Sequence, residues 1–223
     1  MTNAPVDPRW PKVLSLTVHE FRTPITVVSG YIRMLLQDRA GELSEPQRRL
    51  LEAAEKSCGR LSALVAEVSE LSSLEGGTLA SNKAQTDLHA ALTAAVGQIA
   101  PLAEREIPIE LQLADGPTLV HGDPIRLAQA FAAIFGALRR EIVTADRLLV
   151  REARLADGRC ELSIGDEETL AALAAADDLP VFDEWRGGVG LSLLVARRIL
   201  EAHGGQVWGA PGGQKAGARI RIG

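Results

Sequence analysis

Three side chains that could do chemistry together lie close in the sequence: His19, Glu20 and Thr23. In a helix, residues four apart share a face, so Thr23 would lie one turn from His19, with the Glu20 carboxylate beside the imidazole. A neutral imidazole is a nucleophile near pH 7, and an adjacent carboxylate can hold one ring nitrogen and fix the tautomer. A lone surface histidine is more often only solvated, but the added acid and hydroxyl predict a site that meets another molecule.

The sequence around these residues predicts a long amphipathic helix. Apolar side chains recur at alternating spacings of four and three, which is typical of a coiled coil or four-helix bundle. This seam consists of Leu14, Val18, Phe21, Ile25, Val28, Ile32 and Leu35. His19, Glu20 and Thr23 fall off the seam and are expected in solvent. Pro24 lies inside the pattern, where proline should cost about 3 kcal/mol and kink the helix.

A second helix of the same character is expected after a turn at residues 40–44. Ser44 should cap it, Pro46 lies in its first turn, and Gly76 and Gly77 should end it. Its apolar stripe consists of Leu50, Ala54, Ser57, Leu61, Leu64, Val68 and Leu71. Two such helices cannot bury both stripes alone, which predicts a homodimeric four-helix bundle. The alternative is a hairpin that packs against the rest of its own chain.

The pattern changes after residue 81. Strands are predicted at 107–113, 118–121, 147–155, 159–164, 206–209 and 218–222, and helices at 87–103, 124–140 and 189–202. Helices mixed with mostly antiparallel strands predict an α+β sandwich, with one sheet under one helical layer. The chain is therefore expected to divide into residues 1–80 and residues 81–223.

Two parts of the sequence resemble bacterial two-component sensor histidine kinases. Residues 19–24 (HEFRTP) resemble the family's phospho-acceptor box, which reads roughly S-H-E-x-R-T-P-L. Residues 82–223 resemble the ATP-binding domain of these kinases, a GHKL-type (Bergerat) sandwich. Four segments carry that resemblance: GDPIRLAQ at 122–129, FDEW at 182–185, GVGLSL at 188–193 and HGG at 203–205. The resemblance implies a helical hairpin for dimerisation and histidine phosphotransfer, forming a dimeric four-helix bundle, followed by an α/β sandwich of GHKL type.

The residues expected to bind Mg²⁺ and adenine depart from the family pattern. Ala133 and Ala137 stand where the family has two asparagines that hold Mg²⁺ and phosphate, and alanine has no oxygen to ligate a hard cation. The family's first glycine box, D-x-G-x-G, reads DEETL at 166–170. Glu168 and Leu170 therefore replace two glycines that would let the backbone approach the adenine.

The lid of the nucleotide site is also reduced, because only Arg186 and Gly187 separate FDEW from GVGLSL. With these three departures we expect no ATP, no other cofactor and no metal in this part of the chain. If a nucleotide is still bound, the residues that resemble its contacts are Asp166, Gly188 and Gly190.

Composition excludes several classes of function. The formal net charge is −5 and no basic cluster stands out, so nucleic-acid binding is not expected. Cys58 and Cys160 share no metal-ligand or redox spacing, as in a reduced cytosolic protein. Neither a membrane-spanning stretch nor a signal peptide is recognisable, which predicts a cytoplasmic protein without membrane contact. Only 18 residues precede His19, so we expect the input to come from another protein or another site.

The resemblance implies a phosphorelay protein, specifically a histidine phosphotransferase and response-regulator phosphatase that does not use ATP. His19 would exchange a phosphoryl group with the aspartate of receiver domains, Glu20 would orient or deprotonate His19, and Thr23 would help place water for dephosphorylation. The expected partners are a second copy of the chain and response-regulator receiver domains, which bring their own aspartate and Mg²⁺. An upstream kinase is a further candidate.

Two alternatives stay open. In one, the chain is an atypical sensor kinase that autophosphorylates His19 from ATP. In the other, it is a non-catalytic, kinase-like interaction module. Under the preferred interpretation His89, His121 and His203 are dispensable for the chemistry, because they are expected to lack acid and hydroxyl partners.

Overall fold

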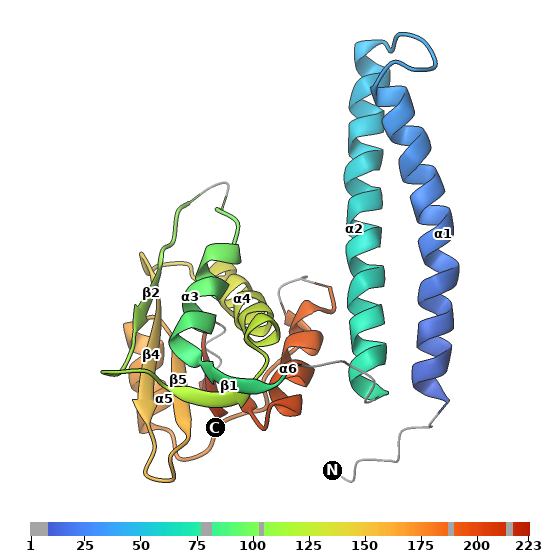
Figure 1. Cartoon of the computed structure of the whole chain (residues 1–223). Helices are drawn as coiled ribbons and strands as arrows, with labels where there is room; N and C mark the ends of the chain where they lie inside the picture. The colour runs from blue at the N-terminus through green and yellow to red at the C-terminus, as the bar shows by residue number, and fades with distance from the viewer. Residues whose placement is uncertain (1–8, 77–81, 103–104, 187–189, 213–215) are drawn as a thin grey trace. The chain divides into compact units, whose positions relative to one another are not determined.

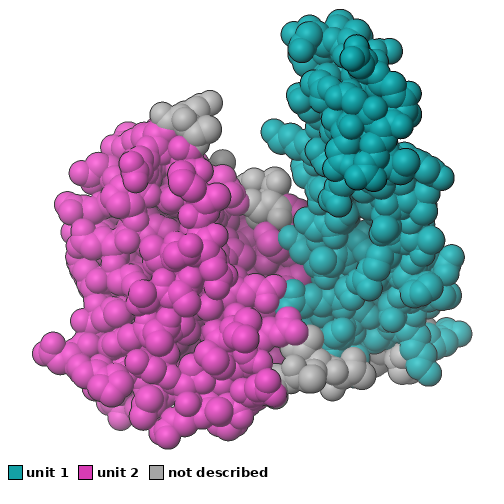
Figure 2. Space-filling model, turned by 45° about the horizontal axis from the view of Figure 1, so that its top comes forward, with its two compact units in different colours: residues 1–79 teal, residues 80–223 magenta. Residues whose placement is uncertain are grey.

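The computed structural model describes residues 9–76, 82–102, 105–186, 190–212 and 216–223. The chain forms two compact units, residues 1–79 and 80–223, coloured separately in Figure 2. Within the described residues, no helix is both long enough and apolar enough to cross a membrane.

The first unit is a hairpin of two long helices (Figure 1), α1 (Trp10–Leu36) and α2 (Glu45–Glu75). α1 continues through Pro24. Ser44 caps α2, and its backbone N–H donates to Oε1 of Gln47 at 2.8 Å. The Ser44 cap is confirmed, and α2 ends just before Gly76 as expected, whereas Gly77 lies outside the described residues.

Polar contacts tie the hairpin at both ends. At the turn, Arg48 forms a two-pronged ion pair with Asp38, with both N–O distances 2.9 Å, and also donates to the carbonyl of Leu36. At the open end, the Ser72 hydroxyl donates to the carbonyl of Pro11 at 2.7 Å. These contacts fix the register of α1 against α2, and hence the faces that each helix exposes.

Part of the apolar seam of α1 remains exposed in a single hairpin. Val18 and Ile32 are buried, whereas Phe21 and Val28 are 55% and 48% exposed. A groove of about 370 Å³ runs along this unit, lined by Thr17, Val18, Phe21, Ile25, Leu61, Leu64, Val65 and Val68. As the sequence predicts, two helices alone do not bury both stripes.

The second unit contains two sheets. The larger has the strand order β2-β4-β5-β7-β6, with β2 (Ile109–Gln112), β4 (Leu148–Arg154), β5 (Cys160–Gly165), β7 (Ala218–Ile222) and β6 (Gln206–Gly209). Only β2 and β4 pair in parallel. The smaller sheet pairs β1 (Ala84–Asp87) with β3 (Leu119–Gly122). The expected single sheet is therefore wrong: residues 119–122 pair with a strand that the sequence did not suggest.

Helices cover both faces of the larger sheet. α3 (Leu88–Gln98), α4 (Pro124–Glu141) and α6 (Ser192–Ala202) form the main layer (Figure 1). On the other face, α5 (Glu167–Ala175) packs Leu170 and Leu173 against Leu149 and Ala210. The expectation of one helical layer missed α5. It also placed the end of α3 about five residues late, because Ile99 already has extended backbone.

Candidate functional site

His19 lies on the exposed surface of α1 beside its acidic neighbour. The side chains of His19 and Glu20 are 78% and 73% exposed, and Nδ1 of His19 lies 3.6 Å from Oε1 of Glu20. Within the described part of the chain, the other ring nitrogen, Nε2, makes no hydrogen bond. A carboxylate facing Nδ1 favours the tautomer that carries its proton there, which leaves the Nε2 lone pair for a reacting molecule.

Thr23 completes this group one turn further along α1, where it is exposed. Other threonines of the helix bond their own backbone: Thr17 donates to the carbonyl of Val13, and Thr26 to that of Arg22, both at 2.8 Å. No such bond to the carbonyl of His19 is formed by Thr23 within the described residues. Its hydroxyl is therefore available to water or to a partner.

Pro24 changes the backbone at the same place. Because proline has no N–H, the carbonyl of Glu20 loses its donor four residues further along the helix. A helical carbonyl without its intrahelical partner is an acceptor for water or for a docking molecule. The proline thus adds a polar atom to the surface that carries His19, Glu20 and Thr23.

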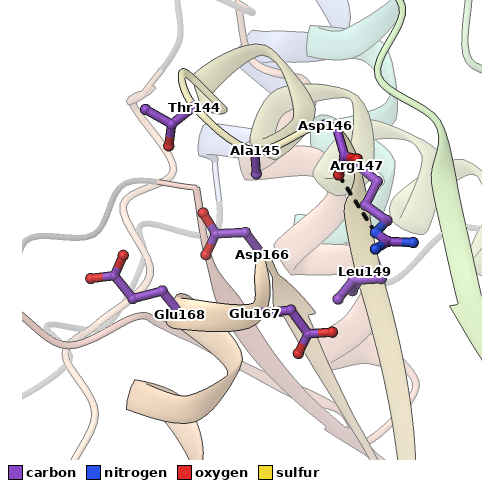
Figure 3. A pocket seen from close by; sticks show the side chains of 8 residues that line it. All are labelled: Thr144, Ala145, Asp146, Arg147, Leu149, Asp166, Glu167 and Glu168. Carbon is purple, nitrogen blue, oxygen red and sulfur yellow. Dashed lines mark ion pairs between the residues drawn. The ribbon is translucent and has the colours of Figure 1, made fainter.

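The second unit has an acidic pocket of about 260 Å³ where the sequence resembles a nucleotide site (Figure 3). It is lined by Thr144, Ala145, Asp146, Arg147, Leu149, Asp166, Glu167 and Glu168. The carboxylates of Asp166 and Glu168 point to the same side of the pocket in this view. Its one lining cation, Arg147, is shared between Asp146 (3.5 Å) and Glu110 (3.2 Å). The pocket carries excess negative charge, which repels a triphosphate.

The segment 166–170, which corresponds to the family's first glycine box, forms the start of α5. Asp166 caps α5, and its Oδ1 accepts the backbone N–H of Thr169 at 2.8 Å. Leu170 is 3% exposed and belongs to the cluster around Leu149. The side chain that replaces a family glycine is therefore a core residue, and removing it would open a cavity beneath α5.

The α4 positions that in the family would meet Mg²⁺ and phosphate carry alanine here. Ala133 is half-buried and Ala137 is buried. One turn after Ala137, Glu141 pairs with Arg186, with 3.4 Å between the Glu141 carboxylate oxygen Oε2 and Nη1 of Arg186. The Arg186 guanidinium also lies 4.8 Å from the centre of the Phe182 ring. An ion pair thus occupies this end of α4.

Of the two glycines assigned to a nucleotide, Gly188 lies outside the described residues. Gly190 has φ 69°, a left-handed conformation that glycine adopts without strain, just before α6. The backbone of Gly190 therefore turns the chain into the helix.

The motifs that resemble the kinase framework do come together. The Nε2 atom of His203 accepts the backbone N–H of Asp123 at 3.1 Å, and Nδ1 bonds the carbonyl of Ile199 at 2.7 Å. A Cβ on Gly122 would lie 3.0 Å from the His203 ring, so the glycine allows the close approach. Burial lowers the pKa of His203. A neutral histidine thus joins the HGG segment to the start of α4.

A second acid–histidine pair, which the sequence did not predict, lies in the second unit. Nε2 of His89 lies 2.6 Å from Oε2 of Glu152, and Oε1 of the same carboxylate accepts the Thr118 hydroxyl. The expectation that His89 lacks acid and hydroxyl partners is therefore wrong. Period-two alternation in β4 was the available signal, since it places Glu152 on the face of Leu148 and Val150.

The His89–Glu152 pair is a structural contact inside the second unit. The Glu152 side chain is completely buried, and it also accepts the backbone N–H of Ala114 at 2.9 Å. Burial alone would raise the pKa of Glu152, but its hydrogen bonds and His89 lower it below the usual 4.5. The carboxylate joins α3, β4 and the segment between β2 and β3. Burial and Glu152 raise the pKa of the nearby Cys160 thiol to about 12, which makes it unreactive.

The donors around the second unit's pocket do not fit MgATP. Glu168 and Leu170 replace the glycines, alanines replace the amide ligands, and an ion pair stands at the end of α4. Within the described residues, no group of three or more His, Cys, Asp or Glu side chains is arranged to hold a metal. The chemistry proposed for His19 therefore uses no ATP or Mg²⁺ bound by this chain.

Comparison with known proteins places these features in context. Residues 12–77 match the family "His Kinase A (phospho-acceptor) domain". The chain is 27% identical over 203 residues to the signal transduction histidine-protein kinase BarA of Escherichia coli K12. It is 26% identical over 207 residues to the circadian input-output histidine kinase CikA of Synechococcus elongatus. These alignments cover 85% and 87% of this chain but only 22% and 27% of the two relatives.

Among solved structures, full-length ShkA in complex with AMPPNP is similar with a TM-score of 0.70 at 24% sequence identity. The match covers 95% of this chain and 45% of that chain. The histidine kinase AdeS of Acinetobacter baumannii is similar with a TM-score of 0.54 at 22% identity. These likenesses show the fold: a phospho-acceptor hairpin followed by an α/β domain of GHKL type.

Proposed function

This chain belongs to the family of two-component sensor histidine kinases, and from that premise we propose that it carries phosphate on His19 without using ATP. His19 would exchange the phosphoryl group with the aspartate of response-regulator receiver domains. Domains of the His Kinase A family typically dimerise and partner with response regulators. Experiments that test this proposal must identify the specific receiver, the phosphoryl donor and the direction of net phosphate flow.

One observation supports the proposal: His19, Glu20 and Thr23 are exposed together on α1, while the α4 positions that would hold Mg²⁺ carry alanine. His19, with Glu20 beside it and 78% of its side chain exposed, can meet a second protein. The Glu141–Arg186 pair and the buried Ala137 offer Mg²⁺ and phosphate no amide oxygen. A receiver that brings its own aspartyl phosphate and Mg²⁺ needs only the exposed His19.

The transfer step follows from the position of Glu20. The Nε2 lone pair of His19 attacks the phosphorus of the receiver's aspartyl phosphate. An N–P bond forms, the P–O bond to aspartate breaks, and the carboxylate leaves with the electron pair. The Nδ1 proton stays on the ring, where the Glu20 carboxylate 3.6 Å away offsets the positive charge that develops. The reverse step returns the phosphoryl group to a receiver.

Removal of phosphate from a receiver would use Thr23 instead. A hydroxyl one turn from His19, without an intrahelical acceptor, can orient a water molecule toward the receiver's phosphorus. That water, not the imidazole, would then attack. Transfer and dephosphorylation thus share a surface but require different side chains.

The competing function is autophosphorylation from ATP. The bond between His203 and Asp123, and the retained Asp166 cap, favour it because they keep the kinase framework. The discriminating experiment offers two donors separately: labelled ATP with Mg²⁺, and a receiver phosphorylated on aspartate by a small phosphodonor. We expect label on His19 only from the receiver. Label from ATP alone would establish the kinase instead, and label from neither would leave the interaction module.

A further inference from the structure

A cationic pocket of about 490 Å³ lies at the C-terminal end of α4. Its lining consists of Leu102, Arg105, Ile107, Arg139, Arg140, Ile142 and Val143. Three side chains are cationic and four are aliphatic, and none of the described lining residues is acidic. The volume lies in the range of small-molecule sites, roughly 300–1,000 Å³. The pocket shares no lining residue with the acidic pocket of Figure 3.

Arg139 is the unusual member of this lining. It is only 8% exposed, and within the described residues its one hydrogen bond runs from Nη2 to the carbonyl of Ala100. Its Nε is buried without any partner. Burial and the neighbouring Arg140 lower the pKa of this guanidinium. A buried cation that faces a neutral carbonyl, with a donor left over, is costly unless an anion joins it.

The other two arginines add charge without neutralising it. Arg105 donates to the backbone carbonyls of Val143 and Ala145. Arg140 is exposed and forms no ion pair within the described residues. The last turn of α4 attracts cations, but a helix C-terminus supplies only about half a negative charge. Among the described lining residues, three full positive charges therefore converge on the cavity, and only partial charges offset them.

The buried arginine of the pocket lies away from the α4 face that resembles a nucleotide site. At 3.6 residues per turn, Arg139 lies about 160° around the helix from Glu141, whereas Arg140 lies about 20° from Ala133 and so borders that face. Glu141 is paired with Arg186, so it does not neutralise the arginine cluster. Leu102, Arg105 and Ile107, which lie between α3 and β2 in the sequence, complete the lining.

We propose that this pocket binds a small molecule in which an oxyanion is joined to a compact apolar body. The oxyanion contacts the guanidinium groups of Arg139, Arg105 and Arg140. The apolar body packs against Ile107 and Ile142, which are 3% and 7% exposed. A carboxylate and a phosphate ester share this chemistry. The site is additional to phosphoryl exchange at His19 and does not depend on it.

The test uses the whole chain and NMR of the arginine Nε–Hε groups. Phenyl phosphate and benzoate represent the two oxyanions, inorganic phosphate lacks the apolar body, and phenol lacks the charge. We expect phenyl phosphate or benzoate to shift the Arg139 signal saturably, with a Kd below about 1 mM. Inorganic phosphate should bind at least tenfold more weakly, and phenol should not compete.

The variants separate binding from folding. Arg139→Met keeps the aliphatic length and should fold, since it replaces a buried unpaired cation by an apolar chain; it should weaken binding at least tenfold. Arg140→Met, at an exposed position, serves if Arg139→Met is unstable and should also weaken binding. Arg159→Gln, an exposed arginine at the opposite end of β4 and β5, should change nothing. No saturation up to about 10 mM would overturn the proposal, as would unchanged affinity in both pocket variants.

Discussion

Glu141 and Arg186 form an ion pair in which both side chains are largely buried, at 15% and 11% exposure. Glu141 lies four residues after Ala137, so the pair extends the same α4 face by one turn. Arg186 comes from the short segment after Phe182 and also lies over that ring. Where the kinase family has a mobile cover and amide ligands, this chain has one arginine held by a carboxylate and an aromatic face.

The first prediction concerns nucleotide affinity. With alanines at 133 and 137, Glu168 in the pocket and the Glu141–Arg186 pair, ATP should bind more weakly than ~100 μM, which corresponds to about 5.5 kcal/mol. Calorimetry with MgATP checks it. A one-to-one isotherm with a tighter Kd would mean that the site has rearranged around a nucleotide, and the account of the second unit would be wrong.

The second prediction concerns assembly, for which we propose a homodimer through the first unit. Phe21 and Val28 are exposed in the single hairpin, so replacing both by Glu should give a folded monomer. Ile32→Glu should instead unfold the hairpin, because Ile32 is buried within it. Val27→Glu, exposed about 100° further round α1, is the matched control and should remain dimeric. Light scattering that finds the wild type monomeric at tens of micromolar would exclude the bundle.

The third prediction is a pH dependence of stability caused by His203. Its folded-state pKa is lowered from 6.5 by burial, so below pH 6.5 the unfolded chain binds a proton that the folded protein does not. Stability is therefore complete above pH 6.5 and falls as the pH falls toward the folded-state pKa. His203→Gln should lose this part of the slope and about 1–3 kcal/mol of stability.

Denaturant unfolding at a series of pH values measures this effect as a difference between variants. His121→Gln, at an exposed position of β3, is the control and should keep the wild-type slope. The lowered pKa values of Asp123 and Glu152 add stability that is lost only below their usual 3.8 and 4.5, outside this window. A wild-type slope in His203→Gln would show that the ring is not held neutral.

The sequence predicted the elements whose signals are local and periodic. The four-three repeat around Val18 and the Ser44 cap gave both helices of the hairpin, and strands β6 and β7 lie at the predicted residues. The segment 166–170 was read as a broken glycine loop, although Asp166 followed by two glutamates is also a helix start. Because this segment resembles a glycine loop of the family, the sequence did not predict the helix α5.

Long-range pairings were beyond such patterns. Strand β1 has only four residues and exists because Thr86 and Asp87 pair with β3, more than 30 residues later. The tie between His89 and Glu152 joins residues 63 apart in sequence, and only the alternation in β4 hinted that Glu152 is buried. The Glu141–Arg186 pair likewise could not be predicted from local sequence, because neither residue lies in a motif that indicates its partner.

The fourth prediction separates the two reactions proposed for the α1 surface. Thr23→Ala should leave transfer between receiver and His19 unchanged within about twofold, because the imidazole itself attacks. It should slow dephosphorylation of the receiver by roughly 10²-fold or more, the usual size of a general acid–base contribution. Thr23→Ser should restore most of that rate, since it retains the hydroxyl. Equal loss of both reactions would instead indicate that Thr23 is needed for docking.

The most direct test of the account follows phosphate from a labelled receiver to His19. His19→Gln removes the nucleophile at a position that is 78% exposed, so circular dichroism and the oligomeric state should match the wild type. We predict that the wild type takes up label from the phosphorylated receiver, that the label is acid-labile as expected for phosphohistidine, and that His19→Gln takes up none. Label retained in a folded His19→Gln protein, or no uptake by the wild type from any receiver of its own cell, would contradict the assignment of His19 as the phosphoryl carrier.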